Sequence, residues 1–577
     1  MKKMENPVKY FEEHRFHTGY DQYKDTGLPI SSEYSPYLPE TLLDRRTFLR
    51  MMSALGSAAF MCIWAPGCKP SGQDTVSRNK RAGSNYLIMA TAVHLYTIDP
   101  AVGFDTAIVS CLKSLYDSLF RHEGHPPRAI PWLARKYNVS ENDTEWTFEL
   151  HPNAVFHDGS PVTAEAVRYS FERLMRIGKG AATLFSGITD GSGVTVIDEH
   201  TVKFRLLRPY RWLPHILTWL FIVNPRLVKK NNAGDDGCAW MNDHEAGSGP
   251  FTILKWKPGE RYILKAVSDY WRGWPSEKHI DGYERVIIKD TNTRMRAIGQ
   301  GEVDIADWGP PDVQLHLKKK GFFVVEAPSI ETYEIKLNNA EGPTADIHVR
   351  KAISYAFDYD ALKEIWGDRC VLMQGPLSPG MEYYSRDMRV YRTDMDKARK
   401  ELSKSPWPNG EFSLDFVYVT GLSEERKTGE IMRDRLAALS IRVNLIPMVW
   451  ADAVETFRDS RTAPAMFPIY SFSHPDMGGT LWSAYHSSRA GEWTNSGHYR
   501  NSAVDDLLER IRSTMNTDEI ENLYFLLQQQ IVDDAANIFC VSPLDHHIYS
   551  PRVTNIKYCP VMGSAVDFFN IRLTPRE

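Results

Sequence analysis

The sequence predicts a mixed α/β protein of two lobes behind an N-terminal export segment. A chain of 577 residues with 42% hydrophobic residues supplies enough apolar surface for large cores. Strand-like and helix-like segments alternate along most of it, as in α/β proteins. The net charge of −5 excludes a broad nucleic-acid-binding surface and a polybasic membrane tether.

The export segment is predicted from a short apolar run behind two basic residues. Arg45 and Arg46 precede an uncharged stretch at 51–64 that ends in small residues before Cys68. A membrane-spanning helix needs about 20 apolar residues, so this run is too short to be one. It resembles a twin-arginine signal with a lipoprotein cleavage box. We therefore expect a signal peptide at 1–67, lipidation of Cys68, and a flexible tether that completes residues 68–83.

Local patterns then predict the elements of the first lobe in order. Residues 85–90 form an apolar, strand-like run, and 145–150 alternate polar and apolar side chains as a half-buried strand does. Thr163 precedes apolar residues at helical spacing and is the expected N-cap of that helix. A helix is also expected at 107–119, and further strands at 195–197, 201–207, 251–255, 262–266 and 285–289.

After residue 325 strands and helices alternate more regularly, which predicts a second α/β lobe. The expected helices are 349–357, 361–366, 398–402, 430–439, 501–515 and 520–535, and the expected strands are 412–418 and 441–446.

One long block carries a resemblance to a known family. Residues 146–173, which include the turn His157-Asp158-Gly159, resemble the signature block of the family 5 extracellular solute-binding proteins. These proteins are the receptors of oligopeptide, dipeptide and nickel ABC importers. Further similar blocks follow in the family's order at 97–101, 115–119, 246–251, 270–273, 301–305 and 349–356. The resemblance extends over residues 85–577.

The resemblance implies a large, type II-like clamshell with a hinge between its lobes. The large lobe would comprise 84–335 with 541–577, and the small lobe 336–540, with crossings near 335–338 and 539–544. The chain contains no P-loop, and the resemblance implies a separate ABC permease and ATPase as partners. We expect an extracytoplasmic, lipid-anchored monomer, at the cell surface or in the periplasm, that is not an enzyme and has neither cofactor nor bound metal.

The resemblance also places ligand contacts in the small lobe. The family's cleft loop resembles residues 470–476, where peptide-binding relatives usually carry an Asp at the place of Ser473. That carboxylate pairs with the peptide ammonium, and Ser473 supplies no such charge. The expected ligand-binding residues are Tyr470, Ser473, His474, Trp482, Tyr485, Trp493, Asn495, His94 and Tyr383.

Several ligand classes remain open. Aromatic side chains at 470–495 suit peptide side chains, sugar rings or planar chelates, so a peptide-like ligand stands beside an oligosaccharide or a nickel or haem chelate. His474, His486 and His498 match no compact metal motif. A remote alternative is a penicillin-recognising serine acyltransferase. Its motifs are imitated by Ser110-x-x-Lys113, Ser268-Asp269-Tyr270 and Lys427-Thr428-Gly429.

Overall fold

The structure, a computed structural model, describes residues 85–575 apart from 93–94, 105–107, 190, 308, 473–476, 546 and 562–565. The predicted export segment, with Arg45, Arg46 and Cys68, lies outside the described residues. Within them, no helix is long and apolar enough to cross a membrane. The described cysteines are all free thiols: Cys111, Cys238, Cys370, Cys540 and Cys559.

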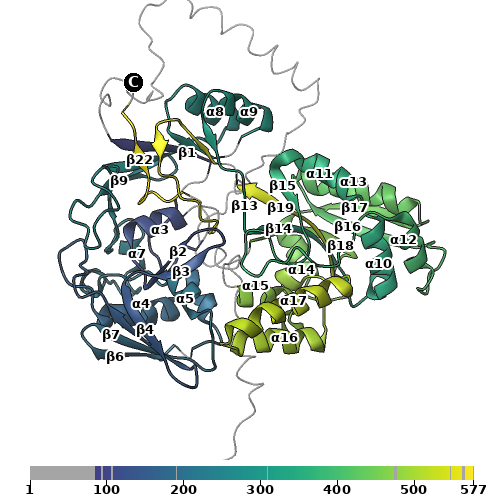
Figure 1. The fold of residues 1–577 in the computed structure, drawn as a ribbon, viewed down its shortest axis with the longest axis horizontal. Helices are drawn as coiled ribbons and strands as arrows, with labels where there is room; N and C mark the ends of the chain where they lie inside the picture. Colours follow the sequence, from purple (N-terminus) through teal and green to yellow (C-terminus); the bar gives the residue numbers. More distant parts are fainter. Residues whose placement is uncertain are drawn as a thin grey trace, which may run out of the picture. The chain divides into compact units, whose positions relative to one another are not determined.

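The first lobe is built on a sheet with the strand order β12, β20, β11, β1, β10, β9, β8; Figure 1 labels β1 and β9 of this sheet. Its strands are β1 Tyr86–Thr91, β8 Phe251–Lys257, β9 Arg261–Ala266, β10 Gly282–Ile287, β11 Ile305–Ala306, β12 Phe323–Val324 and β20 Ile548–Tyr549. Leu87 and Met89 of β1 enter one hydrophobic cluster, whereas Ile88 and Ala90 enter another with α8 (Thr291–Gly299) and α9 (Pro311–Lys319). Burial on both faces explains the continuous apolar run in the sequence.

A smaller sheet in the same lobe has the order β4, β5, β7, β6. Its strands are β4 Ala134–Val139, β5 Glu145–Leu150, β6 Val194–Asp198 and β7 Thr201–Arg205, and α4 (Ala164–Ile177) packs against β6 and β7. Side chains of β5 alternate between partly and fully buried, as predicted. The Thr163 hydroxyl accepts the Ala166 N–H at 3.4 Å, which confirms the expected cap of α4.

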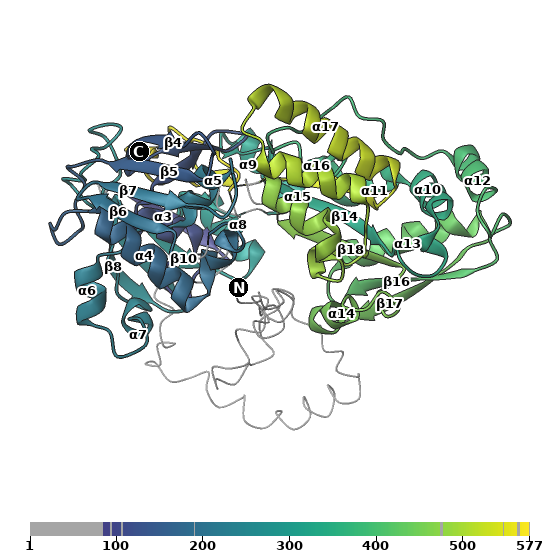
Figure 2. The same ribbon diagram turned by 90° about the horizontal axis from the view of Figure 1, so that it is seen from below.

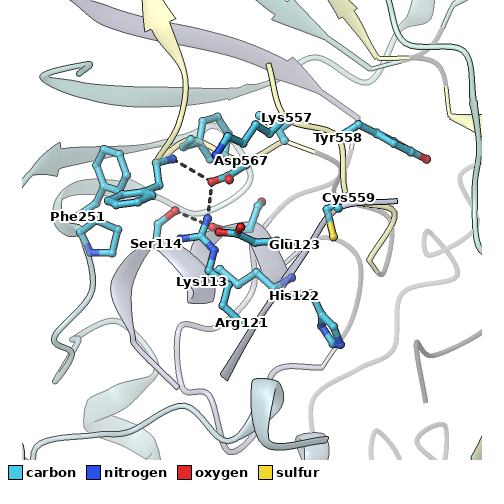
Figure 3. A pocket seen from close by; sticks show the side chains of 16 residues that line it. Lys113, Ser114, Arg121, His122, Glu123, Phe251, Lys557, Tyr558, Cys559 and Asp567 are labelled. Carbon is cyan, nitrogen blue, oxygen red and sulfur yellow. Dashed lines mark hydrogen bonds and ion pairs between the residues drawn. The ribbon is translucent and has the colours of Figure 1, made fainter. Parts of the chain in front are cut away.

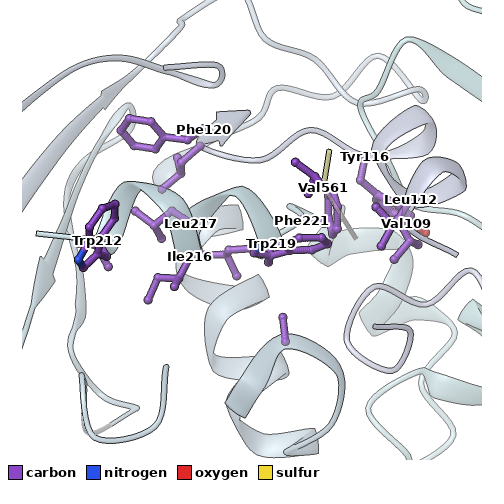
Figure 4. Packing of buried hydrophobic residues seen from close by; sticks show 14 of the residues in the cluster. Val109, Leu112, Tyr116, Phe120, Trp212, Ile216, Leu217, Trp219, Phe221 and Val561 are labelled. Carbon is purple, nitrogen blue, oxygen red and sulfur yellow. The ribbon is translucent and has the colours of Figure 1, made fainter. Parts of the chain in front are cut away.

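The remaining elements of the first lobe are short. They are α3 Val109–Leu115, β2 Phe120–Glu123, β3 Arg128–Pro131, α5 Leu213–Ile216, α6 Pro225–Lys230, α7 Cys238–Met241, β21 Val553–Thr554 and β22 Arg572–Leu573. The helix expected at 107–119 ends at Leu115, because Tyr116 adopts an extended backbone with φ −126° and ψ 147°. Val109 and Leu112 of α3 pack in one cluster with Trp219 and Val561 (Figure 4).

The second lobe is built on a sheet with the order β13, β19, β14, β18, β16, β17, and β15 pairs with β19. Its strands are β13 Ala327–Pro328, β14 Glu331–Leu337, β15 Cys370–Leu372, β16 Ser413–Val419, β17 Arg442–Met448, β18 Met466–Phe472 and β19 Asn537–Asp545. The chain passes from the first sheet to the second between Val324 and Ala327, and returns between Asp545 and Ile548. We expected the crossings at 335–338 and 539–544. These residues instead lie inside β14 and β19, which pair with each other within the second sheet.

Helices cover both faces of the second sheet (Figure 2). They are α10 Ile347–Ala356, α11 Tyr359–Trp366, α12 Met395–Leu402, α13 Ser423–Ala437, α14 Trp450–Thr456, α15 Met477–Tyr485, α16 Ser502–Ser513 and α17 Thr517–Asp533. Tyr333 and Ile335 of β14 share a core with α10, α11 and α13, whereas Glu334 on the other face hydrogen-bonds Tyr485 of α15. Buried residues of α15, α16 and α17 belong to the main cluster of the first lobe.

Candidate functional site

Asp117 joins three of the sequence blocks that carry the family resemblance. Its Oδ1 accepts hydrogen bonds from Trp132 Nε1 and the Tyr270 hydroxyl, each at 2.8 Å. Its Oδ2 accepts from Trp271 Nε1 at 2.8 Å and from Ser248 Oγ at 3.0 Å. Burial raises the pKa of Asp117 despite these donors. The carboxylate fixes the chain between α3 and β2 and thereby positions the cavity beside it.

A close backbone contact fixes the C-terminal end of α3 at Leu115. A Cβ atom on Gly247 would lie 1.9 Å from the Leu115 carbonyl oxygen, so this position requires glycine. His157 contacts Glu245 at 2.8 Å and the Gly249 carbonyl at 2.8 Å. The His157-Asp158-Gly159 segment is therefore a structural turn, as predicted.

A cavity of about 360 Å³ opens beside α3 (Figure 3). Its lining comes from α3, β2, the start of β8 and the C-terminal segment: Ser110, Lys113, Ser114, Arg121, His122, Glu123, Gly124, Pro250, Phe251, Lys557, Tyr558, Cys559, Val566, Asp567, Phe568 and Phe569. This volume is at the lower end of the range for small-molecule sites, and such sites combine apolar walls with a few charged groups.

Lys113 is a partly buried cation of the cavity that has no ion-pair partner among the described residues. Its ammonium lies 5.3 Å from the centre of the Trp219 ring, and among the described residues it makes neither a hydrogen bond nor an ion pair. Burial lowers the pKa of Lys113 to about 8. Arg121, in contrast, is paired with Asp567. An uncompensated cation in a cavity favours an anionic group of a ligand.

Tyr558 connects this cavity with the passage between the two sheets. Its hydroxyl donates a hydrogen bond to the Pro328 carbonyl at 3.3 Å. Burial raises the pKa of Tyr558 strongly, and the charges of Asp545 and Glu331 add to that rise.

Three aromatic rings pack together near the C-terminal end of β18. The ring of Tyr470 lies 4.8 Å from that of Tyr333 and 5.9 Å from that of Trp366, centre to centre. Tyr470 is partly buried against the core of the second lobe. Ser473 and His474 follow β18 but lie outside the described residues, as does His94.

Two of the predicted ligand contacts are engaged within the protein. The Tyr485 side chain is buried, and its hydroxyl lies 3.3 Å from Glu334 Oε2 and 3.1 Å from Asn537 Nδ2. Asn495 is also buried, and its side chain hydrogen-bonds both the backbone N–H and the carbonyl of Tyr499. In this structure both residues organise the second lobe.

The other aromatic candidates do not form one group. Trp482 stacks on His486 with ring centres 3.6 Å apart and faces the Arg512 guanidinium at 4.3 Å. Trp493 packs with the cluster around α14. Tyr383 stacks on Tyr524 at 4.6 Å, with its own backbone at φ +59°.

The serine-acyltransferase motifs are not brought to one site. Ser110 lines the cavity and its hydroxyl accepts a hydrogen bond from Arg285 at 2.7 Å. Thr428 is buried in α13, bonded to the Tyr333 hydroxyl and the Glu424 carbonyl. Neither 268–270 nor 427–429 contributes to the lining of the cavity among the described residues.

The sequence interpretation missed Lys113 and Tyr558 as cavity residues. A signal existed for Lys113, because it is the sole charge in the apolar helix Val109–Leu115. Tyr558 carries no local signal, since only the packing of the C-terminal segment brings it to the cavity.

Comparisons with known proteins identify the family of the chain. The family model described as "Bacterial extracellular solute-binding proteins, family 5 Middle" matches residues 128–492. The probable D,D-dipeptide-binding periplasmic protein DdpA of Escherichia coli K12 is 31% identical over 467 residues, 78% of this chain and 87% of the relative. The glutathione-binding protein GsiB of Pectobacterium atrosepticum is 26% identical, over 82% of this chain and 91% of its own.

Solved structures show the same fold at lower identity. HbpA2 from Haemophilus parasuis has a TM-score of 0.76 and 21% identity, covering 85% of this chain and 100% of that one. DppA from Helicobacter pylori, in complex with the peptide STSA, has a TM-score of 0.69 and 22% identity, covering 85% and 98%. NikZ from Campylobacter jejuni, in complex with Ni(L-His), has a TM-score of 0.68 and 19% identity, covering 85% and 99%. These neighbours have the two-lobed fold of periplasmic binding proteins.

Proposed function

The chain belongs to the family 5 bacterial extracellular solute-binding proteins, the receptors of ABC importers, and on that basis we propose that its ligand is a short peptide. Three curated relatives that cover most of the chain are named for D,D-dipeptide, glutathione and dipeptide binding. All three ligands are small, peptide-like and carry a free carboxylate.

The observation that carries the proposal is the unpaired Lys113 ammonium in the cavity of the first lobe. A ligand carboxylate there would form a charge-assisted contact in a partly desolvated place, where such contacts are strong. Tyr558, Phe251 and Phe569 supply apolar walls for the side chain next to that carboxylate.

On the second lobe, we propose that the ligand contacts Tyr470 together with Ser473 and His474. The support is that β18 ends at Phe472, directly before this loop, and that Tyr470 is only partly buried. The two passages at 324–327 and 545–548 are the proposed hinge, because each joins the first sheet to the second. Closure around the ligand would then present one conformation to the permease.

The route of export and the lipid anchor are proposed from the N-terminal segment. Arg45 and Arg46 would direct twin-arginine export, and lipidated Cys68 would anchor a monomer outside the cytoplasm beside its permease and ATPase. Membrane fractionation and mass spectrometry of the mature N-terminus test this.

A calorimetric titration of the full chain tests the ligand class. The panel contains D-alanyl-D-alanine, L-alanyl-L-alanine, glutathione, the nickel–histidine complex, haem and a cello-oligosaccharide. We expect one peptide to bind per chain with an affinity higher than that of every non-peptide. Binding of the oligosaccharide or a metal chelate alone would replace the peptide proposal with that alternative.

A further inference from the structure

The two passages between the sheets run side by side in opposite directions. β12 pairs with β20 at the first sheet, and β13 pairs with β19 at the second. Between these pairs, the Val325 N–H donates a hydrogen bond to the carbonyl of His547 at 3.0 Å. Because both passages meet here, His547 lies where one lobe would turn against the other.

The side chain of His547 joins a carboxylate of the second sheet to a carboxylate of the first. The residue is buried, and its Nδ1 lies 2.5 Å from Oδ1 of Asp545, the last residue of β19. Its Nε2 lies 3.9 Å from Oδ1 of Asp307, which follows β11. Asp307 is fixed to the first sheet, since its Oδ2 accepts the Ala92 N–H at 3.0 Å directly after β1. The imidazole ring therefore bridges the two sheets at the passage.

The two carboxylates favour the charged form of the ring. An imidazole with an acidic acceptor beside each nitrogen is matched best when both nitrogens carry protons, as they do in the imidazolium. Burial opposes that charge, but Asp545 and then Asp307 raise the pKa of His547 above its usual 6.5. Arg285 of β10 acts against them, and the ring of Tyr549 lies 6.5 Å from the imidazole.

Two further acids lie near the passages. Glu326 is exposed and pairs with Lys318. Glu331, the first residue of β14, has a pKa that burial and then Asp545 raise to about 7. Glu331 thus titrates in a range close to that of His547, so a test of the histidine needs a variant of Glu331 beside it.

We propose that the protonated ring of His547 latches the passage at 545–548 to the first sheet, and that loss of its proton frees the two lobes to turn against each other. On deprotonation the Nδ1 proton stays toward Asp545, whereas the Nε2 proton passes to the solvent. Nε2 then directs a lone pair at Asp307 Oδ1, so repulsion replaces attraction. Salt screens this change only weakly, because the groups are largely buried. This inference rests on the proposed hinge and adds a control by pH.

The sign of the pH dependence follows from the raised pKa. Below about pH 6.5 the histidine is charged in both the folded and the unfolded chain, and the latch contributes fully. As pH rises through the higher pKa of the folded protein, the latch is lost. The lobes should therefore be held more tightly at pH 6 than at pH 9.

Pulsed electron paramagnetic resonance on the ligand-free, full-length protein measures the distance between the lobes. Spin labels on non-natural amino acids replace Lys136 in β4 and Arg399 in α12, which are both exposed, and the native thiols stay unlabelled. We expect one narrow distance distribution at pH 6. At pH 9 the mean distance should shift by more than about 2 Å or the distribution should broaden by that amount.

Four variants assign the response to the latch. His547→Gln keeps an N–H donor but carries no charge, so it should show the pH 9 distribution of the wild type at every pH. Asp307→Asn keeps an oxygen acceptor and loses the charge, so it should also lose the pH response. Glu331→Gln should keep that response. His244→Gln is the matched control, because His244 is an exposed histidine beside an aspartate in the same lobe as Asp307, and it should behave like the wild type.

The outcomes separate the latch from the hinge. A wild-type distribution that is the same from pH 5.5 to 9.5, or an unchanged pH response in His547→Gln, would overturn the latch. A response that is lost in Glu331→Gln but kept in His547→Gln would overturn it too and assign the titration to Glu331. Labels that move when D-alanyl-D-alanine is added, but not with pH, would refute the latch and leave the hinge standing. Labels that move with neither would refute the proposed hinge itself.

Discussion

Replacing Lys113 by Met is expected to stabilise the protein while it weakens ligand binding. Lys113 is a partly buried cation whose pKa burial lowers to about 8, and its ammonium lies over the Trp219 ring without an ion-pair partner among the described residues. Methionine keeps the length and apolar character of the side chain and removes the charge. The two effects have opposite signs because the charge of Lys113 strengthens ligand binding but destabilises the folded protein.

The magnitude follows from the pKa of the lysine. An ordinary lysine has a pKa of about 10.5, so the folded protein lowers it by about 2.5 units, equivalent to roughly 3 kcal/mol at pH 7. The contact with Trp219 offsets about 0.5–2 kcal/mol of that cost. We therefore expect Lys113→Met to raise the free energy of unfolding by about 1–3 kcal/mol.

The pH dependence gives the sign check. Below pH 8 the lysine is charged in both the folded and the unfolded chain, so the advantage of the variant is constant. Between about pH 8 and 10.5 the unfolded chain binds more protons than the folded one, so the wild type gains stability as pH rises. The advantage of Lys113→Met should therefore shrink over that interval.

Urea unfolding at pH 7 and at pH 10, followed by titration with D-alanyl-D-alanine, measures both effects. Lys557→Met is the matched control, because Lys557 lines the same cavity but is exposed, and its stability should change by less than about 0.5 kcal/mol. Affinity for the dipeptide should fall about 10- to 100-fold in Lys113→Met. A Lys113→Met variant that is less stable at pH 7, or that binds the peptide as well as the wild type, would refute the reasoning.

Three further predictions concern the scaffold and the anchor. Asp117→Asn places an amide N–H₂ against the indole N–H of Trp132 or Trp271, whichever way the amide turns. The free energy of unfolding in urea should fall by about 1–3 kcal/mol, and an unchanged unfolding midpoint would contradict the hydrogen-bond network of Asp117. Gly247→Ala forces a Cβ to within 1.9 Å of the Leu115 carbonyl oxygen, so the soluble yield should collapse, and a melting temperature within a few degrees of the wild type would show that this contact relaxes. Cys68→Ala should move the protein from the membrane fraction to the soluble fraction, and retention at the membrane would argue against a lipid anchor there.

Elements with strong local patterns were predictable from the sequence. The alternation of β5 and the Thr163 cap of α4 follow from local chemistry and agree with the structure. The passages between sheets were harder to predict, because the local sequences of β14 and β19 do not show which sheet each strand joins. Their pairing with each other settles that, and it is a contact between segments about two hundred residues apart.

The candidate site was predictable only in part, for a related reason. Lys113 matches a catalytic S-x-x-K pattern in the sequence, whereas the structure shows it beside Trp219 in a cavity that the C-terminal segment helps to line. Tyr485 has the residue type of a ligand contact, yet Glu334 and Asn537 engage its hydroxyl. Residue type predicts what a side chain is able to do, and packing decides whether that capacity is already used.

The central claim, that this receptor captures a peptide through the cavity at Lys113, is tested most directly by one titration. The full-length wild type is titrated with D-alanyl-D-alanine at pH 7, with D-alanyl-D-alanine amide as the matched ligand that lacks the carboxylate. We predict one dipeptide bound per chain and an affinity for the amide that is about 10- to 100-fold lower. Equal affinity for the dipeptide and its amide would contradict the account, and so would binding of neither by a chain that binds nickel–histidine or an oligosaccharide.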